Sequence, residues 1–98
     1  HWEFFLRARA TENQCWVVAS GQYGVEPQSG IAFVGRSMVI DPWGTVVATA
    51  SDEEGVITTE IDLNFADEVK RRYPLMDQRR PDMYTHIGKP KDQVPLYK

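Results

Sequence analysis

The chain has 98 residues, 42% of them hydrophobic and 11% aromatic, and its 11 basic and 14 acidic side chains give a formal net charge of −3. This length suits one domain, and the composition is that of a globular protein rather than a disordered one. The acidic balance lacks the basic surface that nucleic acids require, so we expect no nucleic-acid partner. We also expect no membrane partner, since no window approaches the about 20 apolar residues that cross a bilayer.

Cysteine usage points to the cellular compartment. The chain has one cysteine, Cys15, which excludes an intrachain disulfide framework. Such usage favours a reducing compartment, and we therefore expect a cytoplasmic location.

The first predicted element is an amphipathic helix from Trp2 to Gln14, because apolar side chains recur there at helical spacing. Glu3 and Arg7 are an i,i+4 pair in the favourable order, and we expect them to be solvated. Arg9 and Glu12 lie three residues apart and are also expected to pair. Two interpretations of this second pair stay open: a surface ion pair, or a partly buried pair at a packed interface.

The helix passes into a strand without a linker. The continuous apolar run 15–20 predicts a strand buried on both faces. Residues 21–31 carry three glycines and a proline without periodicity, which predicts a loop. Residues 32–40 predict a second strand.

A turn and two more strands are predicted after residue 40. Residues 41–44 place Asp at position i, Pro at i+1 and Gly at i+3 of a type I turn. Residues 45–50 predict the third strand, and the alternation of 56–61 predicts a half-buried fourth strand. We expect the strands from residue 32 onward to form an antiparallel meander.

A second helix is predicted from a local capping pattern. Asn64 is the expected N-cap with Asp67 at N3, and the basic residues 70–72 suit the C-terminal end of the helix dipole before Pro74. Residues 75–98 combine prolines with little periodicity and predict an extended C-terminal arm that packs on another surface. No internal repeat or second domain boundary is visible.

Few side chains carry chemistry. Cys15 is the obvious nucleophile, but a position after a helix C-terminus among apolar residues disfavours a thiolate, and we interpret it as an inert buried cysteine. His1 and His86 show no zinc-ligand spacing with it. The adjacent carboxylates 52–54 cannot all converge on one cation. Since no nucleotide-binding motif is present either, we expect no metal and no cofactor.

Other polar groups have local roles or mark a contact with substrate. Ser37 has no histidine close in sequence, so we expect its hydroxyl to be satisfied locally. Dipole capping and tail anchoring are favoured over substrate binding for four arginines: Arg71, Arg72, Arg79 and Arg80. The loop after the first strand is the best remaining place for substrate, because sites collect at strand ends, and it offers Gln22 and Tyr23.

Three segments together resemble a known family. Residues 1–3 (His-Trp-Glu), 7–19 and 35–44 (Gly-Arg-Ser-Met-Val-Ile-Asp-Pro-Trp-Gly) resemble the C-terminal third of the nitrilase, or carbon–nitrogen hydrolase, superfamily, in its Nit-type branch. The resemblance runs to about Tyr84. It implies an α/β fold, the C-terminal part of an α-β-β-α sandwich. The chain would be one partial domain, 1–98, with a helix, about four largely antiparallel strands, a second helix and the arm 75–98.

The same resemblance implies a function. The intact family member cleaves small amides with a cysteine nucleophile, a glutamate base and a lysine, all expected upstream of this chain, which by itself is expected to be inactive. It would bind a small amide substrate only with that upstream half. Gln22 and Tyr23 would lie near the pocket rim.

Homodimer formation is the third implication. The family dimerises through outer helices, and the residues expected at the interface come from the first helix and the arm: Trp2, Phe5, Leu6, Arg9, Arg80 and Tyr84. The alternative hypothesis is a non-catalytic homotypic interaction module that kept the dimer surface and lost the site.

Overall fold

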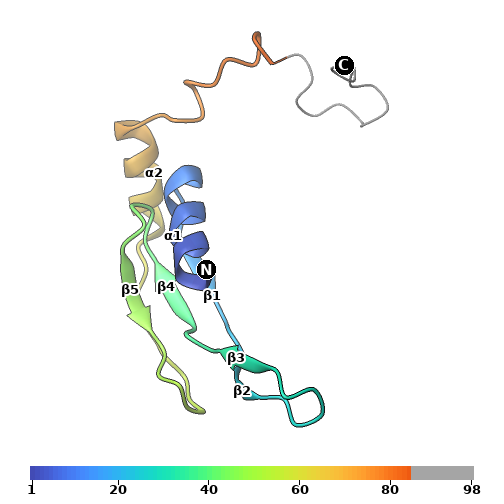
Figure 1. Cartoon of the computed structure of the whole chain (residues 1–98). Helices are drawn as coiled ribbons and strands as arrows, with labels where there is room; N and C mark the ends of the chain where they lie inside the picture. The colour runs from blue at the N-terminus through green and yellow to red at the C-terminus, as the bar shows by residue number, and fades with distance from the viewer. Residues whose placement is uncertain (85–98) are drawn as a thin grey trace, which may run out of the picture.

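The structure, a computed structural model, describes residues 1–84 as a mixed α/β assembly. Its elements in chain order are α1 (Trp2–Asn13), β1 (Val17–Ala19), β2 (Tyr23–Val25), β3 (Ala32–Val34), β4 (Met38–Ile40), β5 (Val46–Thr49) and α2 (Leu63–Arg72). Helix α1 lies along the three-stranded sheet, and the β2–β3 hairpin projects from its far end (Figure 1). The Cα radius of gyration, 18.5 Å, exceeds the about 13 Å of a compact domain of this size. The shape is therefore extended.

The core lies between α1 and the central strand β4. The sheet has the antiparallel order β1-β4-β5, and all three residues of β4 are buried. Ala10 of α1 forms the core cluster with Met38 and Ile40. Half-buried Trp2 and Leu6 of the helix pack against this cluster, as do Val17 and Val46 of the outer strands. The predicted helix is confirmed, and Trp2, Leu6 and Ala10 form its buried face. Its amphipathic pattern is only partial, because Phe4 and Phe5 are exposed.

Helix α1 ends in a Schellman-type closure at Gln14. Gln14 adopts the left-handed conformation (φ 51°), and the Cys15 N–H donates to the Ala10 carbonyl across 3.1 Å. The Gln14 side chain is buried, and its amide donates a hydrogen bond to the Tyr73 carbonyl. A residue that closes one helix thus also ties the C-terminal end of the second helix to it.

The predicted type I turn is present at Asp41–Gly44. The Gly44 N–H donates to the Asp41 carbonyl across 2.9 Å, and the Asp41 carboxylate accepts from the N–H groups of Trp43 and Thr45. The turn is fixed to α1, because Arg7 Nε donates to the Gly44 carbonyl across 2.7 Å. Trp43 meets Tyr73 edge to face, with ring centroids 5.3 Å apart, so the turn also contacts the end of α2.

The predicted strand 32–40 is wrong as one element. Gly35 and Arg36 both have positive φ, 71° and 55°, which breaks the run into β3 and β4. Strand β3 pairs with β2, a strand inside the segment predicted to be a loop, and β4 pairs with β1 and β5. The meander from residue 32 onward is therefore also wrong, since β3 belongs to a separate hairpin.

Three further expectations need correction. The first strand is not buried on both faces, because Val18 is 70% exposed. Segment 56–61 forms no strand, although apolar and polar residues alternate in its sequence. It connects β5 to α2 as an exposed segment, in which Val56 is 89% exposed. The N-cap of α2 is Asp62 rather than Asn64, because the Asp62 carboxylate accepts the Asn64 N–H across 2.9 Å.

Residues 75–84 form successive turns rather than a fully extended segment, as the bond from the Gln78 N–H to the Leu75 carbonyl illustrates. The rest of the predicted arm, 85–98, lies outside the described residues. Between residues 1 and 84, no helix has the length and apolar character needed to cross a membrane.

Gly44→Ala should destabilise the chain by about 1 to 3 kcal/mol. Gly44 has φ 82°, and an added Cβ would lie 2.3 Å from Thr11 Oγ1. Urea unfolding measures the effect. Gly55→Ala is the matched control, since a Cβ there meets nothing within 4 Å, and its effect should stay below about 1 kcal/mol. Equal unfolding midpoints for the two variants would contradict the packing argument.

Candidate functional site

A tight corner joins the hairpin to the sheet and carries the two residues predicted near substrate. Gly21 and Gly35 touch there, since a Cβ on Gly21 would lie 2.3 Å from the Gly35 carbonyl oxygen. The Gly35 N–H donates to the Gln22 carbonyl across 2.8 Å, and the Gly21 N–H donates to Ser37 Oγ across 2.9 Å. The Ser37 hydroxyl is therefore engaged locally, as predicted. The side chains of Gln22 and Tyr23 are exposed next to this corner.

The hairpin itself is an apolar ribbon. Strand β2 pairs with β3 in the register Tyr23↔Val34 and Val25↔Ala32, and every residue of both strands is exposed. Gly24, at φ 94°, gives the ribbon a conformation that other residues rarely adopt. Among helices and strands, β2 and β3 pack substantially only on each other.

A carboxylate closes the hairpin tip. Glu26 accepts hydrogen bonds from the Ser29 hydroxyl, from the Ser29 N–H across 2.7 Å and from the Gln28 N–H across 3.2 Å. These bonds, the one from the Ser29 hydroxyl first, hold the pKa of the Glu26 carboxyl below its ordinary value of 4.5. The tip is therefore a locally satisfied turn.

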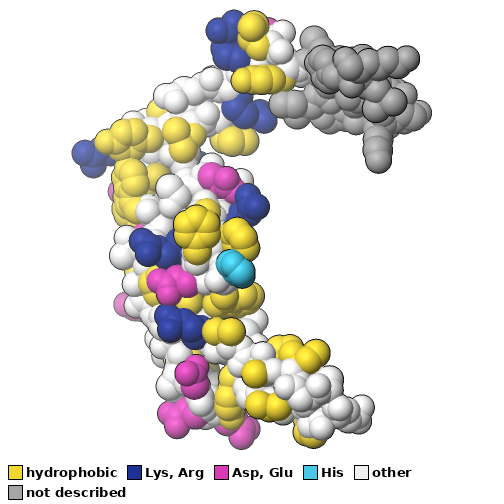
Figure 2. All heavy atoms as spheres, viewed as in Figure 1, with side chains coloured by type: hydrophobic (Ala, Val, Ile, Leu, Met, Phe, Trp, Pro, Cys, Tyr) yellow, Lys and Arg dark blue, Asp and Glu magenta, His cyan; other side chains and the backbone are white. Residues whose placement is uncertain are grey.

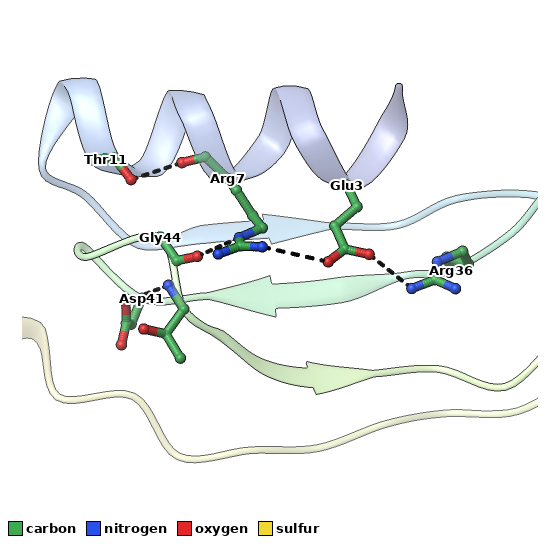
Figure 3. A network of polar contacts seen from close by, with 7 residues as sticks. Glu3, Arg7, Thr11, Arg36, Asp41 and Gly44 are labelled. Atoms are coloured by element: carbon green, nitrogen blue, oxygen red, sulfur yellow. Dashed lines mark hydrogen bonds and ion pairs between the residues drawn. The ribbon is translucent and has the colours of Figure 1, made fainter.

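A polar network joins α1 to both the turn and the corner (Figure 3). Glu3 lies between two arginines, 2.9 Å from an Arg36 nitrogen and 3.9 Å from an Arg7 nitrogen. All three side chains are 39 to 54% exposed, which makes these surface pairs. Trp2 Nε1 donates to the Arg36 carbonyl across 2.9 Å. The link between Glu3 and Arg36 was not predicted from the sequence, because no local pattern signals a contact between residues 33 positions apart.

The outer side of α1 borders an open groove of about 840 Å³. Phe4 is 72% and Phe5 54% exposed. Phe4 lines the groove with Trp43 of the turn and Leu75 beyond α2. Figure 2 shows hydrophobic, basic and acidic side chains interspersed on the face it displays. The groove is an open surface with apolar and charged borders.

The structure separates the residues expected at a dimer interface. Trp2 and Leu6 pack on the chain's own core, whereas Phe5 and Arg9 point outward. Arg9 does pair with Glu12, and within this single chain their side chains are 68% and 52% exposed. The other two expected residues, Arg80 and Tyr84, are exposed beyond α2, where Arg80 pairs with Asp82 at 2.6 Å.

Cys15 is half-buried directly after the closing residue of α1. No group of three or more His, Cys, Asp or Glu side chains within residues 1–84 is arranged to hold a metal ion. The carboxylates 52–54 are exposed in a turn, and His86 lies outside the described residues. Of the arginines considered for substrate, Arg72 lies over the Tyr73 ring at 5.9 Å and Arg79 Nε donates to the Met76 carbonyl.

Comparison with known proteins supplies the family. The sequence profile of the family described as Carbon-nitrogen hydrolase matches residues 1–71. Deaminated glutathione amidase of Homo sapiens is 48% identical over 90 residues, which are 92% of this chain and 27% of that protein. 2-Oxoglutaramate amidase of Bacillus subtilis is 45% identical over 84 residues, 86% of this chain and 32% of that protein. The chain thus spans about a third or less of these relatives' length.

Solved structures agree. Carbon-nitrogen hydrolase from Helicobacter pylori superposes with a TM-score of 0.80 at 37% identity, over 90% of this chain and 32% of that one. The NitFhit protein of Caenorhabditis elegans superposes with a TM-score of 0.81 at 46% identity, over 86% of this chain and 20% of that one. The chain belongs to the carbon–nitrogen hydrolase family, and the expected α/β class is confirmed. Within the family its similarity is to the Nit-type branch.

The pKa of Glu26 should be below 4.5 in the folded chain, as measured by NMR titration of the side-chain carboxyl. Since the folded pKa is lowered, the carboxylate stabilises the hairpin fully above the unfolded pKa, and this contribution is lost as pH falls through the folded value. Ser29→Ala should raise the Glu26 pKa towards its ordinary value. Ser51→Ala, which removes a hydroxyl from another carboxylate, should leave it unchanged.

Proposed function

We propose that this chain forms the scaffold, the pocket rim and part of the dimer interface of a carbon–nitrogen hydrolase that cleaves small amides. The observation that carries the proposal is the family match over residues 1–71, in a chain whose described residues bring no nucleophile, base and oxyanion-stabilising cation together. The nucleophilic cysteine, the glutamate base and the lysine then belong to the remainder of the family domain. Two relatives named as amidases support the amide as substrate class.

The chemistry proposed for the whole domain is acyl transfer through a covalent intermediate. The glutamate takes the proton of the cysteine thiol, and the thiolate attacks the amide carbon while the lysine stabilises the developing oxyanion. Ammonia leaves with a proton delivered by the glutamate. Water, activated by the same glutamate, then attacks the thioester and releases the carboxylic acid. In this scheme Gln22 supplies amide hydrogen bonds and Tyr23 a phenol at the pocket rim.

Ammonia release from 2-oxoglutaramate, the compound in the name of the Bacillus subtilis relative, tests the function. We expect turnover by the full-length polypeptide that carries these residues and none by residues 1–98 alone. A full-length polypeptide that releases no ammonia from this or other small ω-amides, yet self-associates, would support the non-catalytic interaction module instead.

Cys15→Ser should leave ammonia release by the full-length polypeptide within about twofold of wild type. Cys15 follows the C-terminal end of α1, and its N–H is used in the helix closure. Removing a true nucleophile costs about 10⁶-fold in kcat. Initial rates at saturating amide measure the effect, and loss of turnover in this variant would assign the nucleophile to Cys15.

The dimer interface proposed here is the outward face of α1. Trp2 and Leu6 pack against the chain's own core. We therefore propose that the exposed Phe4 and Phe5 supply the apolar contacts of the interface, with Arg9 beside them. A two-fold axis across this face would place the same exposed aromatic pair on both subunits, as isologous contacts require. Arg80 and Tyr84 remain proposed contacts from the segment beyond α2.

Phe5→Glu should raise the dimer dissociation constant about tenfold or more, because it places a charge in an apolar contact. Sedimentation velocity over a dilution series of the full-length polypeptide measures the shift. Val56→Glu makes the same change at a more exposed apolar residue outside α1 and should leave association unchanged. A monomeric wild type, or equal dissociation constants for the two variants, would exclude this face.

A further inference from the structure

The orientation of the β2–β3 hairpin is set by very few contacts. Its two strands pack mainly on each other. Its apolar side chains are exposed, for example Val25 at 63% and Val34 at 64%. Figure 1 shows the hairpin leaving the sheet at an angle, away from both helices. What fixes that angle must therefore lie at its base, where the chain enters through Gly21 and returns through residues 35–37.

Helix α1 holds this base at three points. The Trp2 indole donates to the Arg36 carbonyl, which fixes the backbone, and Glu3 pairs with the Arg36 guanidinium, which fixes the side chain. The Trp2 ring is also close to the crossing of the two strands, since a Cβ on Gly21 would lie 3.4 Å from it. Arg36 is thus held by two successive residues of the first turn of α1.

The conformation of Arg36 makes this hold significant. Arg36 is one of two non-glycine residues within 1–84 that have positive φ, and it directly follows Gly35, also at positive φ. A non-glycine residue in the left-handed region costs about 1 kcal/mol or more and persists only where its surroundings enforce it. These two successive residues with positive φ lie at the corner where the chain turns from β3 into β4 (Figure 1). The contacts from α1 favour this conformation and thereby the exit angle of β3.

The hairpin base carries Gln22 and Tyr23, and the Gln22 carbonyl accepts the Gly35 N–H across 2.8 Å. A change in the conformation at residues 35 and 36 is therefore transmitted directly to Gln22. Resting on the proposed function, we infer that Glu3 and Arg36 are positioning residues: their ion pair, with the Trp2 indole, holds the hairpin base so that Gln22 and Tyr23 meet the amide substrate. Neither Glu3 nor Arg36 needs to touch the substrate.

The test uses the full-length polypeptide and four variants: Glu3→Gln, Arg36→Gln, the double variant and Arg36→Lys. Both side chains are half-exposed, so these variants should fold. Hydrogen exchange of the amides of residues 22–35 reports hairpin positioning without any need for catalysis. An exposed ion pair predicts exchange about 2- to 5-fold faster in each single Gln variant. The double variant should be no worse than Glu3→Gln, because Glu3→Gln alone already removes the pair with Arg36, together with the weaker contact to Arg7. Arg36→Lys, which keeps the charge, should fall between wild type and Arg36→Gln.

The kinetic readout separates positioning from general destabilisation. We expect the KM for the amide to rise about 2- to 5-fold in the single Gln variants, with kcat unchanged, since weakened rim contacts lose binding in ground and transition states alike. Glu12→Gln is the matched control. It breaks another exposed pair on α1, that with Arg9, which does not touch the hairpin base, and should change neither exchange nor KM.

Each outcome decides the inference. Unchanged exchange in Glu3→Gln and Arg36→Gln would overturn it, whether or not the protein is an amidase. Faster exchange with an unchanged KM would also overturn it, because the hairpin base would then move without affecting substrate. Absence of turnover in the wild-type polypeptide would refute the proposed function, and with it the substrate part of the inference, whereas the exchange data alone decide whether the pair positions the hairpin.

Discussion

The burial of Ala10 against Met38 and Ile40 sets the distance between α1 and the sheet, and the polar links depend on that distance. A methyl side chain lets the helix approach β4 closely. Only then can Arg7 reach the Gly44 carbonyl and Trp2 the Arg36 carbonyl. A bulkier residue in place of Ala10 would overpack the cluster and lift the helix off both contacts. Local apolar packing therefore determines the geometry of a network whose individual bonds are weak at an exposed surface.

Elements with local signals were predictable from the sequence. The period of α1 and the Asp-Pro-x-Gly turn each depend on neighbouring residues, and both are observed. The broken strand was not predictable, because an arginine at positive φ is uncommon and Gly35 alone marks only a bulge or a close approach. Segment 56–61 was predicted as a strand and forms none. Alternation of apolar and polar residues fits a strand, but a strand also needs a neighbouring strand to pair with, and alternation does not supply one. At the start of α2, Asp62 and Asn64 were both chemically able to cap, and the backbone at Asp62 decided between them.

The candidate site was predictable only in part. Glycines and a polar–aromatic pair pointed to the segment after β1, and Ser37 was expected to be satisfied locally. The residues that hold this segment were not predictable. Glu3 and Arg36 lie 33 residues apart, and the residues next to each of them in the sequence give no sign of a long-range contact. Trp2 was expected at a dimer interface because the family resemblance implied dimerisation through the helix that carries it. The structure shows in addition that its indole N–H and ring make contacts within the chain. Which face an aromatic residue serves depends on the register between helix and sheet, and that register is a tertiary property.

The small core has a calorimetric consequence. Within residues 1–84 the buried hydrophobic residues are Ala10, Met38, Val39, Ile40 and Val69. The heat-capacity increment of unfolding comes from apolar surface newly exposed to water, and compact domains show about 12 to 15 cal/mol/K per residue. In this chain the apolar side chains of the β2–β3 hairpin are already exposed to water in the folded state. Unfolding therefore exposes less additional apolar surface than in a compact domain. The chain's increment and its unfolding enthalpy should both be small, so its melting is gradual and its stability varies little with temperature.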